Sequence, residues 1–243
     1  VDINPTFTNG AYTGLSNYAL RVGGSANFTK DIIVNSTMIG SGYNQTTGTN
    51  NIAIGNSALR ANTTGSSNIA IGNSALFYFN QSVSGNNIAI GSYALGSSSM
   101  TSTATANIAI GDSSLTGVTS GQENIAIGPY SLNKLTSGKW NNAVGSQSMN
   151  NGAVTGTESN GFGMYSLYSL TSGSNNSAFG SRALNDHTTG HNNSAFGSYA
   201  LYSNTTARYN TAVGSFAFRW LNGTTGDLGD YNTGLGSNAG LYT

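Results

Sequence analysis

The sequence predicts an all-β fold, a parallel β-solenoid of the β-roll type, from three observations. A five-residue motif, Asn-Ile-Ala-Ile-Gly, recurs along most of the chain, its copies most often lie about 17 residues apart, and turn-forming residues stand between them. Helical repeat units such as tetratricopeptide and ankyrin repeats need about 33 residues. A unit of half that length instead holds two short strands and two turns.

The motif ends in a glycine, and this glycine marks each unit. The motif glycines are Gly40, Gly55, Gly72, Gly91, Gly111, Gly128, Gly145, Gly163, Gly180, Gly197, Gly214 and Gly236. The differences between successive glycine numbers are 15, 17, 19, 20, 17, 17, 18, 17, 17, 17 and 22, so the modal repeat is 17. We therefore expect about twelve coils in a solenoid domain over residues 40–243, preceded by a β-rich connector or cap over residues 1–39.

Each unit contains a predicted strand, a turn and a second apolar position. In the clearest unit, residues 52–54 form a short Ile-rich run between Asn51 and Gly55, and Leu59 is the large apolar residue that nearly always follows four residues after the glycine. Asn stands four residues before the glycine in ten of the last eleven units. We expect this Asn to adopt the left-handed backbone conformation at a turn and to stack in an amide ladder, which is a structural role.

The predicted strands are apolar on both faces, which indicates association between chains. Alternation places Ile52 and Ile54 on one face and Ala53 on the other, and the small Ala53 suits the narrow interior of a coil. The Ile face then needs a cover from outside, which other copies of the chain would supply. We expect the residue before each glycine to lie nearest the symmetry axis, although open sheets or fibrils are the alternative. These residues, the Ile/Phe stripe, are Ile54, Ile71, Ile90, Ile110, Ile127, Val144, Phe162, Phe179, Phe196, Val213 and Leu235.

Composition excludes several classes of function. Eight Lys and Arg balance eight Asp and Glu, charged residues make up 7% of the chain, and there is no basic run, which argues against a nucleic-acid partner. The chain has no Cys, so it has no disulfide, thiolate metal site or Cys nucleophile. No stretch approaches the roughly 20 apolar residues of a membrane helix. We expect no cofactor, no metal and no membrane insertion.

Two groups of known repeats resemble this pattern. The Asn-x-Ala-Ile-Gly unit followed by Ser-x-Ala resembles the head repeats of trimeric autotransporter adhesins, which stack as left-handed parallel β-rolls in a homotrimer. The Tyr-Ala-Leu-Tyr-Ser-Asn-Thr-Thr run at 199–206 and the Tyr-Asn-Thr-Ala-Val-Gly run at 209–214 are similar to repeats of bacteriophage tail fibres, often found upstream of an endosialidase-type intramolecular chaperone. Residues 19–24 and 28–35 are similar to the connector that precedes such repeats.

The resemblance covers roughly residues 17–240 and implies a fold, an assembly and a function. It implies a left-handed roll in a homotrimer, intertwined or side by side, that serves as a non-enzymatic segment of a virion tail fibre or of an extracellular, cell-surface adhesin. Its partners would be a host surface glycan or receptor and other fibre or virion proteins. The alternatives are a structural subunit of an extracellular filament and a polysaccharide-depolymerising tailspike.

Aromatic residues are the candidate glycan contacts, because sugar recognition commonly uses exposed rings. The same rings could instead cover coil edges or neighbouring chains. The regularly placed Tyr93, Tyr130, Tyr165, Tyr199 and Phe216 are expected to form a structural ladder. The candidate binding residues are Phe77, Tyr78, Phe79, Trp140, Tyr202, Trp220 and Tyr231, and the same aromatic loops also offer Tyr168 and Arg219.

Catalysis has little support in the sequence. Conceivable carboxylate pairs for glycoside hydrolysis are Asp112 with Glu123 and Asp227 with Asp230. His187 and His191 flank a turn, where we expect solvated side chains rather than a base or a ligand. An ice-binding solenoid is a further alternative, but the Thr pairs that it would need are missing from the middle units.

Overall fold

The strands form one sheet in chain order. The computed structural model describes residues 32–34, 37–40, 48–78, 85–97, 100–101, 103–221 and 229–240, and for residues 32–34 and 37–40 it gives the course of the backbone only. Over these ranges there are strands and turns but no α-helix. The strands are β1 (Ile32–Val34), β2 (Thr37–Gly40), β3 (Ile52–Ile54), β4 (Ile69–Ile71), β5 (Ile88–Ile90), β6 (Ile108–Ile110), β7 (Ile125–Ile127), β8 (Asn142–Val144), β9 (Asn160–Phe162), β10 (Ser177–Phe179), β11 (Ser194–Phe196), β12 (Thr211–Val213) and β13 (Thr233–Leu235).

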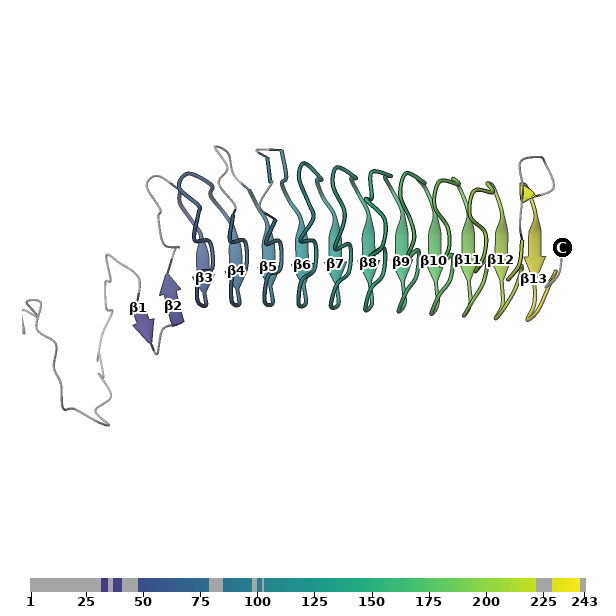
Figure 1. The fold of residues 1–243 in the computed structure, drawn as a ribbon, viewed down its shortest axis with the longest axis horizontal. Helices are drawn as coiled ribbons and strands as arrows, with labels where there is room; N and C mark the ends of the chain where they lie inside the picture. Colours follow the sequence, from purple (N-terminus) through teal and green to yellow (C-terminus); the bar gives the residue numbers. More distant parts are fainter. Residues whose placement is uncertain are drawn as a thin grey trace, which may run out of the picture.

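Strands β3 to β13 are parallel and in register, so the predicted parallel β-solenoid with a repeat of about 17 residues is confirmed. Each strand pairs with the same three positions of the next, as Ile52 with Ile69, Ala53 with Ala70 and Ile54 with Ile71. Figure 1 shows the coils in a single row. With a spacing of about 4.8 Å between strands, the ten steps from β3 to β13 give a rod of roughly 48 Å.

The expected count of about twelve coils is too high. The unit that ends at Gly40 lies in β2, which pairs antiparallel with β3 through Ile39 and Ile54 and through Gly40 and Ala53. This segment is a hairpin with β1, not a coil, because its chain runs in the opposite direction. Of the eleven parallel strands only β4 to β12 have a parallel neighbour on both sides, which gives about nine fully stacked turns.

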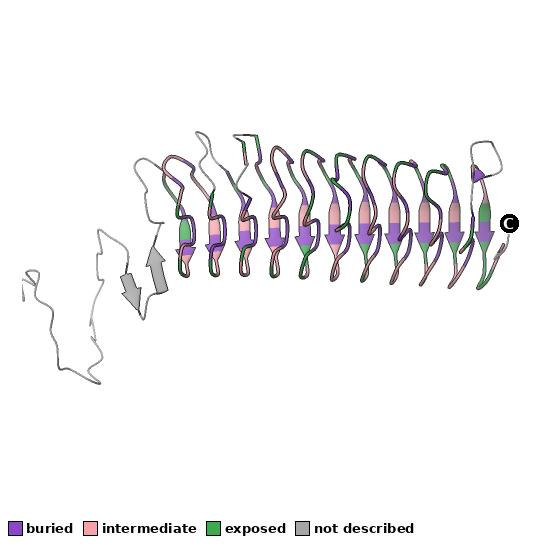
Figure 2. Cartoon of the chain, viewed as in Figure 1, coloured by how far each residue is buried: buried purple, intermediate pink, exposed green. Residues whose placement is uncertain are grey.

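The two faces of each strand differ as alternation predicts. The middle residue of each strand from β3 to β13 is a buried Ala or Gly, and Ala53, Ala70 and Ala89 are completely inaccessible. The flanking residues point outward and remain intermediate or exposed, which Figure 2 shows as a purple centre in each strand. The Ala face therefore packs inside the coil and the Ile face outside, as expected.

A row of large residues fills the rest of the interior. Leu59, Leu76, Leu95 and their equivalents are inaccessible and pack with the strand Ala residues in one core. Each has a positive φ, as in Leu59 at 49°, which turns the chain sharply and aims the side chain inward. Leu in the left-handed region is costly, so the packing of this side chain must outweigh the backbone strain.

The predicted Asn ladder is present, but its turn is displaced by one residue. The ladder Asn side chains from Asn51 to Asn210 are buried and joined along the rod, as in Asn193, whose Oδ1 accepts the backbone N–H and the Nδ2–H of Asn210 at 3.1 Å each. The positive φ lies on the preceding residue, as in Asn192 at 60° and Tyr209 at 57°. The expectation of a left-handed Asn was therefore wrong, because the ladder Asn runs directly into the strand with its amide turned inward.

Candidate functional site: an aromatic and arginine stripe

One side of the rod carries aromatic and Arg side chains at fixed distances from the motif glycines. In the coil that starts at Gly197, the buried Ala200 and Leu201 lie three and four residues after the glycine, so Tyr199 and Tyr202 on either side of them point outward. The same positions in neighbouring coils align because the coils are in register. We call these residues the Tyr/Arg stripe: Tyr165, Tyr168, Arg182, Asn185, Tyr199, Tyr202, Phe216 and Arg219.

The rings of the stripe contact each other within a coil and between coils. Tyr165 and Tyr168 meet edge to face with centroids 5.3 Å apart, and Tyr199 and Tyr202 are also 5.3 Å apart. Tyr199 stacks on Phe216 of the next coil at 5.2 Å and 12°. Such ring pairs add about 0.5–1.5 kcal/mol beyond their buried area, so they hold the stripe in a defined arrangement.

Arg182 lies between two of these rings. Its guanidinium carbon is 5.4 Å from the centroid of Tyr165 and 5.5 Å from that of Tyr199, and its Nη1 donates a hydrogen bond of 2.8 Å to the Tyr199 hydroxyl. The Tyr165 hydroxyl in turn accepts a hydrogen bond of 3.1 Å from Gln147. Both distances lie within the roughly 6 Å over which an aromatic ring attracts a cation. Arg182 thus stands between Tyr165 and Tyr199 in the row of regularly placed rings, whereas Tyr199 and Phe216 of the same row stack directly.

Arg219 is a second cation in the stripe, surrounded by aromatic rings. Its guanidinium carbon lies 4.7 Å from the ring centroid of Trp220, 5.1 Å from that of Phe216, 5.3 Å from that of Tyr199 and 5.9 Å from that of Tyr202. No carboxylate of the described residues forms an ion pair with Arg182 or Arg219. The stripe thus combines fixed positive charge with aromatic surface.

A hollow of about 290 Å³ opens in the middle of the stripe. It is lined by Tyr165, Tyr168, Arg182, Asn185 and Tyr202. Three successive coils carry Tyr168, Asn185 and Tyr202 at the position five residues after the motif glycine. The hollow lies at the middle coil, because the side chain of Asn185 is shorter than the two tyrosines on either side of it. Asn185 is fixed there because its Nδ2 donates to the Tyr165 carbonyl at 3.0 Å. We call this space the Asn185 hollow.

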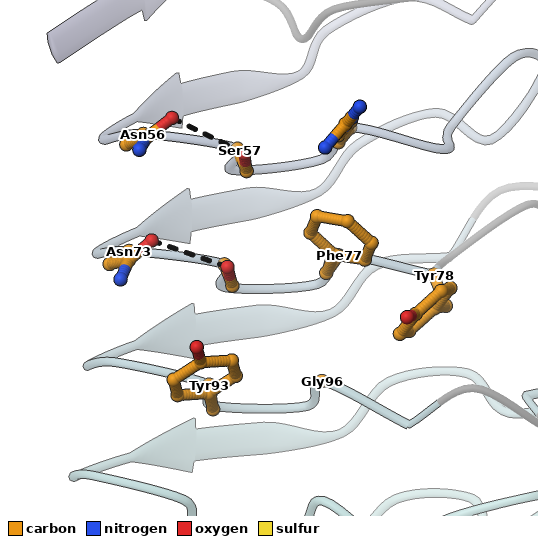
Figure 3. A pocket seen from close by; sticks show the side chains of 9 residues that line it. Asn56, Ser57, Asn73, Phe77, Tyr78, Tyr93 and Gly96 are labelled. Carbon is orange, nitrogen blue, oxygen red and sulfur yellow. Dashed lines mark hydrogen bonds between the residues drawn. The ribbon is translucent and has the colours of Figure 1, made fainter. Parts of the chain in front are cut away.

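A second, larger hollow of about 440 Å³ lies near the other end of the same side (Figure 3). Small side chains open it: Ser57 and Ser74 take the place of the outward Tyr, and each donates to the preceding Asn at 3.2 Å. Arg60 lies over the Phe77 ring at 5.4 Å, and Phe77 meets Tyr78 edge to face at 4.5 Å. The lining residues are Asn56, Ser57, Arg60, Asn73, Ser74, Phe77, Tyr78, Tyr93 and Gly96.

The candidate binding residues do not form one site. Phe77 and Tyr78 line the larger hollow, Tyr202 lines the Asn185 hollow, and Trp220 packs edge to face on Tyr202 at 6.3 Å. Trp140 and Tyr231 stand five residues before a motif glycine, at another position of the coil, where Tyr231 stacks on Tyr209 at 4.7 Å. Phe79 lies outside the described residues. Sequence reasoning missed Arg60 and Arg182, although their constant offsets from the glycines are readable in the sequence.

The carboxylates considered for catalysis are Asp112 with Glu123 and Asp227 with Asp230, and the members of the first pair stand at different positions of their coils. Asp112 directly follows a motif glycine, whereas Glu123 precedes a ladder Asn, and no hydrogen bond joins the two side chains in the described part of the chain. Asp227 lies outside the described residues, and Asp230 accepts a hydrogen bond from the backbone N–H of Arg208 at 2.6 Å. Over the described ranges, no three His, Cys, Asp or Glu residues are grouped closely enough to hold a metal ion.

His187 is buried, so the expectation of a solvated side chain was wrong. It occupies the position seven residues after a motif glycine, where the preceding coil has the buried Leu170. Its Nδ1 lies 3.0 Å from the carbonyl oxygen of Asn204 and its Nε2 lies 2.9 Å from that of Gly190. Burial lowers the pKa of His187 and outweighs the two carbonyl contacts, which raise it. The charge of His191 also lowers the pKa. The folded chain therefore favours a neutral ring.

This histidine predicts a loss of stability in mild acid. In the unfolded chain His187 takes up a proton near pH 6.5, whereas the folded chain resists protonation to a lower pH. Below about pH 6.5 the unfolded state binds more protons, so the free energy of unfolding should fall by up to about 1.4 kcal/mol per pH unit. Urea unfolding between pH 7.5 and 5 measures this slope. His187→Leu, which copies Leu170, should flatten it, and an unchanged slope would contradict the assignment.

The comparisons with known proteins are negative. No family model, no curated protein and no solved structure matches this chain. A search for membrane spans over the described ranges finds no helix long and apolar enough to cross a bilayer.

Proposed function

We propose that this chain is a segment of a homotrimeric, extracellular or virion fibre that attaches to a host or surface glycan without enzymatic activity. The observation that carries the proposal is the Ile/Phe stripe, an apolar row that runs the length of the parallel stack on its outer face. The Tyr/Arg stripe supports the attachment function. The left-handed winding implied by the resemblance to phage fibres and trimeric adhesins belongs to this proposal.

The Ile/Phe stripe favours a partner chain on physical grounds. Phe162, Phe179 and Phe196 stack on one another with centroids 4.8 and 5.0 Å apart, yet 36 to 42% of each side chain stays exposed in the single chain. Completing the burial of such a side chain contributes roughly 1 kcal/mol, a fraction of the 1.5–3 kcal/mol for full burial. Repeated over eleven strands, this driving force favours association.

The assembly is tested by the solution mass of the purified chain, measured by light scattering after size exclusion. A mass near three times 24.8 kDa that persists on dilution is the expected result. A soluble monomer would contradict the trimeric fibre. A large polydisperse assembly would instead favour the extracellular filament, in which contacts through the Ile/Phe stripe do not close into a ring.

A charged residue in the Ile/Phe stripe should prevent the association of chains without unfolding the solenoid. Phe179→Glu places a carboxylate on the outer face of β10, so we expect the mass to fall to that of one chain. The solenoid should persist by circular dichroism, since the inward residue of β10, Ala178, is unchanged. Thr205→Glu, at an exposed position in a turn outside the strands, is the control and should leave the mass unchanged.

The attachment function is tested by binding of the full chain to an array of neutral and acidic glycans. We expect binding that is lost when rings of the Tyr/Arg stripe are removed, as in Tyr202→Ala, but kept in Tyr209→Ala, which removes an exposed ring at the other coil position. Incubation with bound polysaccharides should release no new reducing ends. Release of such ends would show a depolymerising tailspike instead.

A further inference from the structure

We propose that the Asn185 hollow binds an acidic sugar of a polysaccharide, with Arg182 as the receptor for its carboxylate. The inference rests on the proposed attachment to a glycan and adds the charge class of the ligand and the place where it binds. Three observations support it: the shape of the hollow, the positive charge and free donors of Arg182, and a second cation, Arg219, farther along the rod.

The shape of the hollow suits a single sugar ring. Tyr168 and Tyr202 stand two coils apart with the short Asn185 between them, so their rings border a gap as wide as one missing side chain. No hydrogen bond within the described residues uses the hydroxyls of Tyr168 and Tyr202. Both residues line the same space, and a tyrosine combines an apolar ring with a polar hydroxyl.

Arg182 supplies the charge and the directed donors. A guanidinium has five N–H donors in one plane, and here one donates to the Tyr199 hydroxyl at 2.8 Å, with the guanidinium carbon 5.4 Å from the ring centroid of Tyr165 and 5.5 Å from that of Tyr199. Within the described residues the Arg182 side chain forms no other hydrogen bond, and it lines the hollow, so its remaining donors are available to a ligand there. A carboxylate, the acidic group of uronic and sialic acids, presents two oxygens that match this planar arrangement.

The charges nearby favour an anion. Asp186 follows Asn185, but it does not line the hollow. The Ser203 side chain forms a hydrogen bond with its carboxyl, whose pKa is raised by burial and lowered by that bond. Arg219 adds a second cation beside Tyr202, with its guanidinium carbon 5.9 Å from the ring centroid. Arg182 and Arg219 stand two coils apart, roughly 10 Å at the usual strand spacing, so a chain of acidic sugars along the rod would meet both.

The experiment compares probes that differ only in charge. Oligogalacturonate and its methyl ester, and sialyllactose and lactose, are titrated calorimetrically into the full chain at fixed ionic strength. We expect each acidic probe that binds to bind at least tenfold more tightly than its neutral partner. This comparison needs no variant, so it does not depend on the folding of a mutant.

Two variants test whether the acidic sugar contacts Arg182. Arg182→Gln should weaken acidic binding at least tenfold, while Arg208→Gln, which removes an exposed Arg six residues before a motif glycine, should change it less than twofold. Both variants are checked for an unchanged solution mass and circular dichroism spectrum. Equal losses in the two variants would show diffuse charge attraction and overturn the inference.

The remaining outcomes separate this inference from the function on which it rests. Binding of neutral glycans as tightly as acidic ones, or acidic binding that survives Arg182→Gln, would overturn the acidic-sugar site and leave attachment to a glycan standing. Binding to no glycan on the array would overturn both.

Discussion

Gly163→Ala should destabilise the solenoid by at least about 3 kcal/mol, one of the largest effects expected of a single methyl group. Gly163 has a φ of 139°, which side chains rarely adopt, and a Cβ there would lie 2.5 Å from the carbonyl oxygen and 2.6 Å from the carbonyl carbon of Gly180 in the next coil. Neither atom can move without breaking the register of β9 and β10. The free energy of unfolding in urea measures the loss.

Gly236→Ala is the matched control for this effect. Gly236 has a φ of 113°, but no atom lies within 4 Å of the Cβ that Ala would add. Only the cost of the backbone conformation remains, roughly 1–2 kcal/mol. Equal losses in the two variants would mean that the close approach of successive glycines is not what makes this position a glycine.

Asn193→Ala should cost about 3–5 kcal/mol, because it removes five hydrogen bonds from a buried position. The Asn193 amide donates to Asn176 Oδ1 at 3.0 Å, to the Ala207 carbonyl at 2.9 Å and to the His191 carbonyl at 3.3 Å, and its Oδ1 accepts two bonds from Asn210. Each buried group left without a partner costs about 1–3 kcal/mol. The losses should appear as a lower urea midpoint at an unchanged slope.

The chain itself provides the milder substitution. Ser159 occupies the ladder position of its coil, where its Oγ accepts the N–H of Asn176 at 3.3 Å. Asn193→Ser should therefore lose about half as much stability as Asn193→Ala, since a hydroxyl restores one acceptor. If Ser and Ala were equally destabilising, the ladder would owe its stability to packing rather than to hydrogen bonds.

The parallel stack was predictable because the same residues recur at the same spacing. Identical coils can place Ile52 beside Ile69 and Asn51 beside Asn68 only if they align in parallel, so the repeat determines the register as well as the fold. Leu59 with a positive φ was not predictable, because local preference opposes it and only the packing of the finished core explains it. Gly40 was misassigned for a related reason, since a short match to the motif does not determine strand direction.

The candidate site was predictable only in part. The search for aromatic residues in the sequence selected Tyr202 and Trp220, whose rings do lie beside the Arg219 guanidinium. It also selected Trp140 and Tyr231, which stand at another position of the coil. Contacts between coils depend on how many residues separate each side chain from its motif glycine. Choosing residues because they are aromatic does not take this offset into account. The offset would have grouped Arg182 with Tyr165 and Tyr199, and it would have placed His187 with Leu170 in the interior.

The register of the coils also bears on how such a chain can change its length. Residues 181–197 make up one whole unit, which begins after one motif glycine and ends at the next. Their deletion would join Gly180 to Ser198, where the sequence continues Ser-Tyr-Ala-Leu in place of Ser-Arg-Ala-Leu. The rod would shorten by one strand spacing of about 4.8 Å with its ladders intact. Unequal recombination between repeats can therefore lengthen or shorten the rod one whole coil at a time.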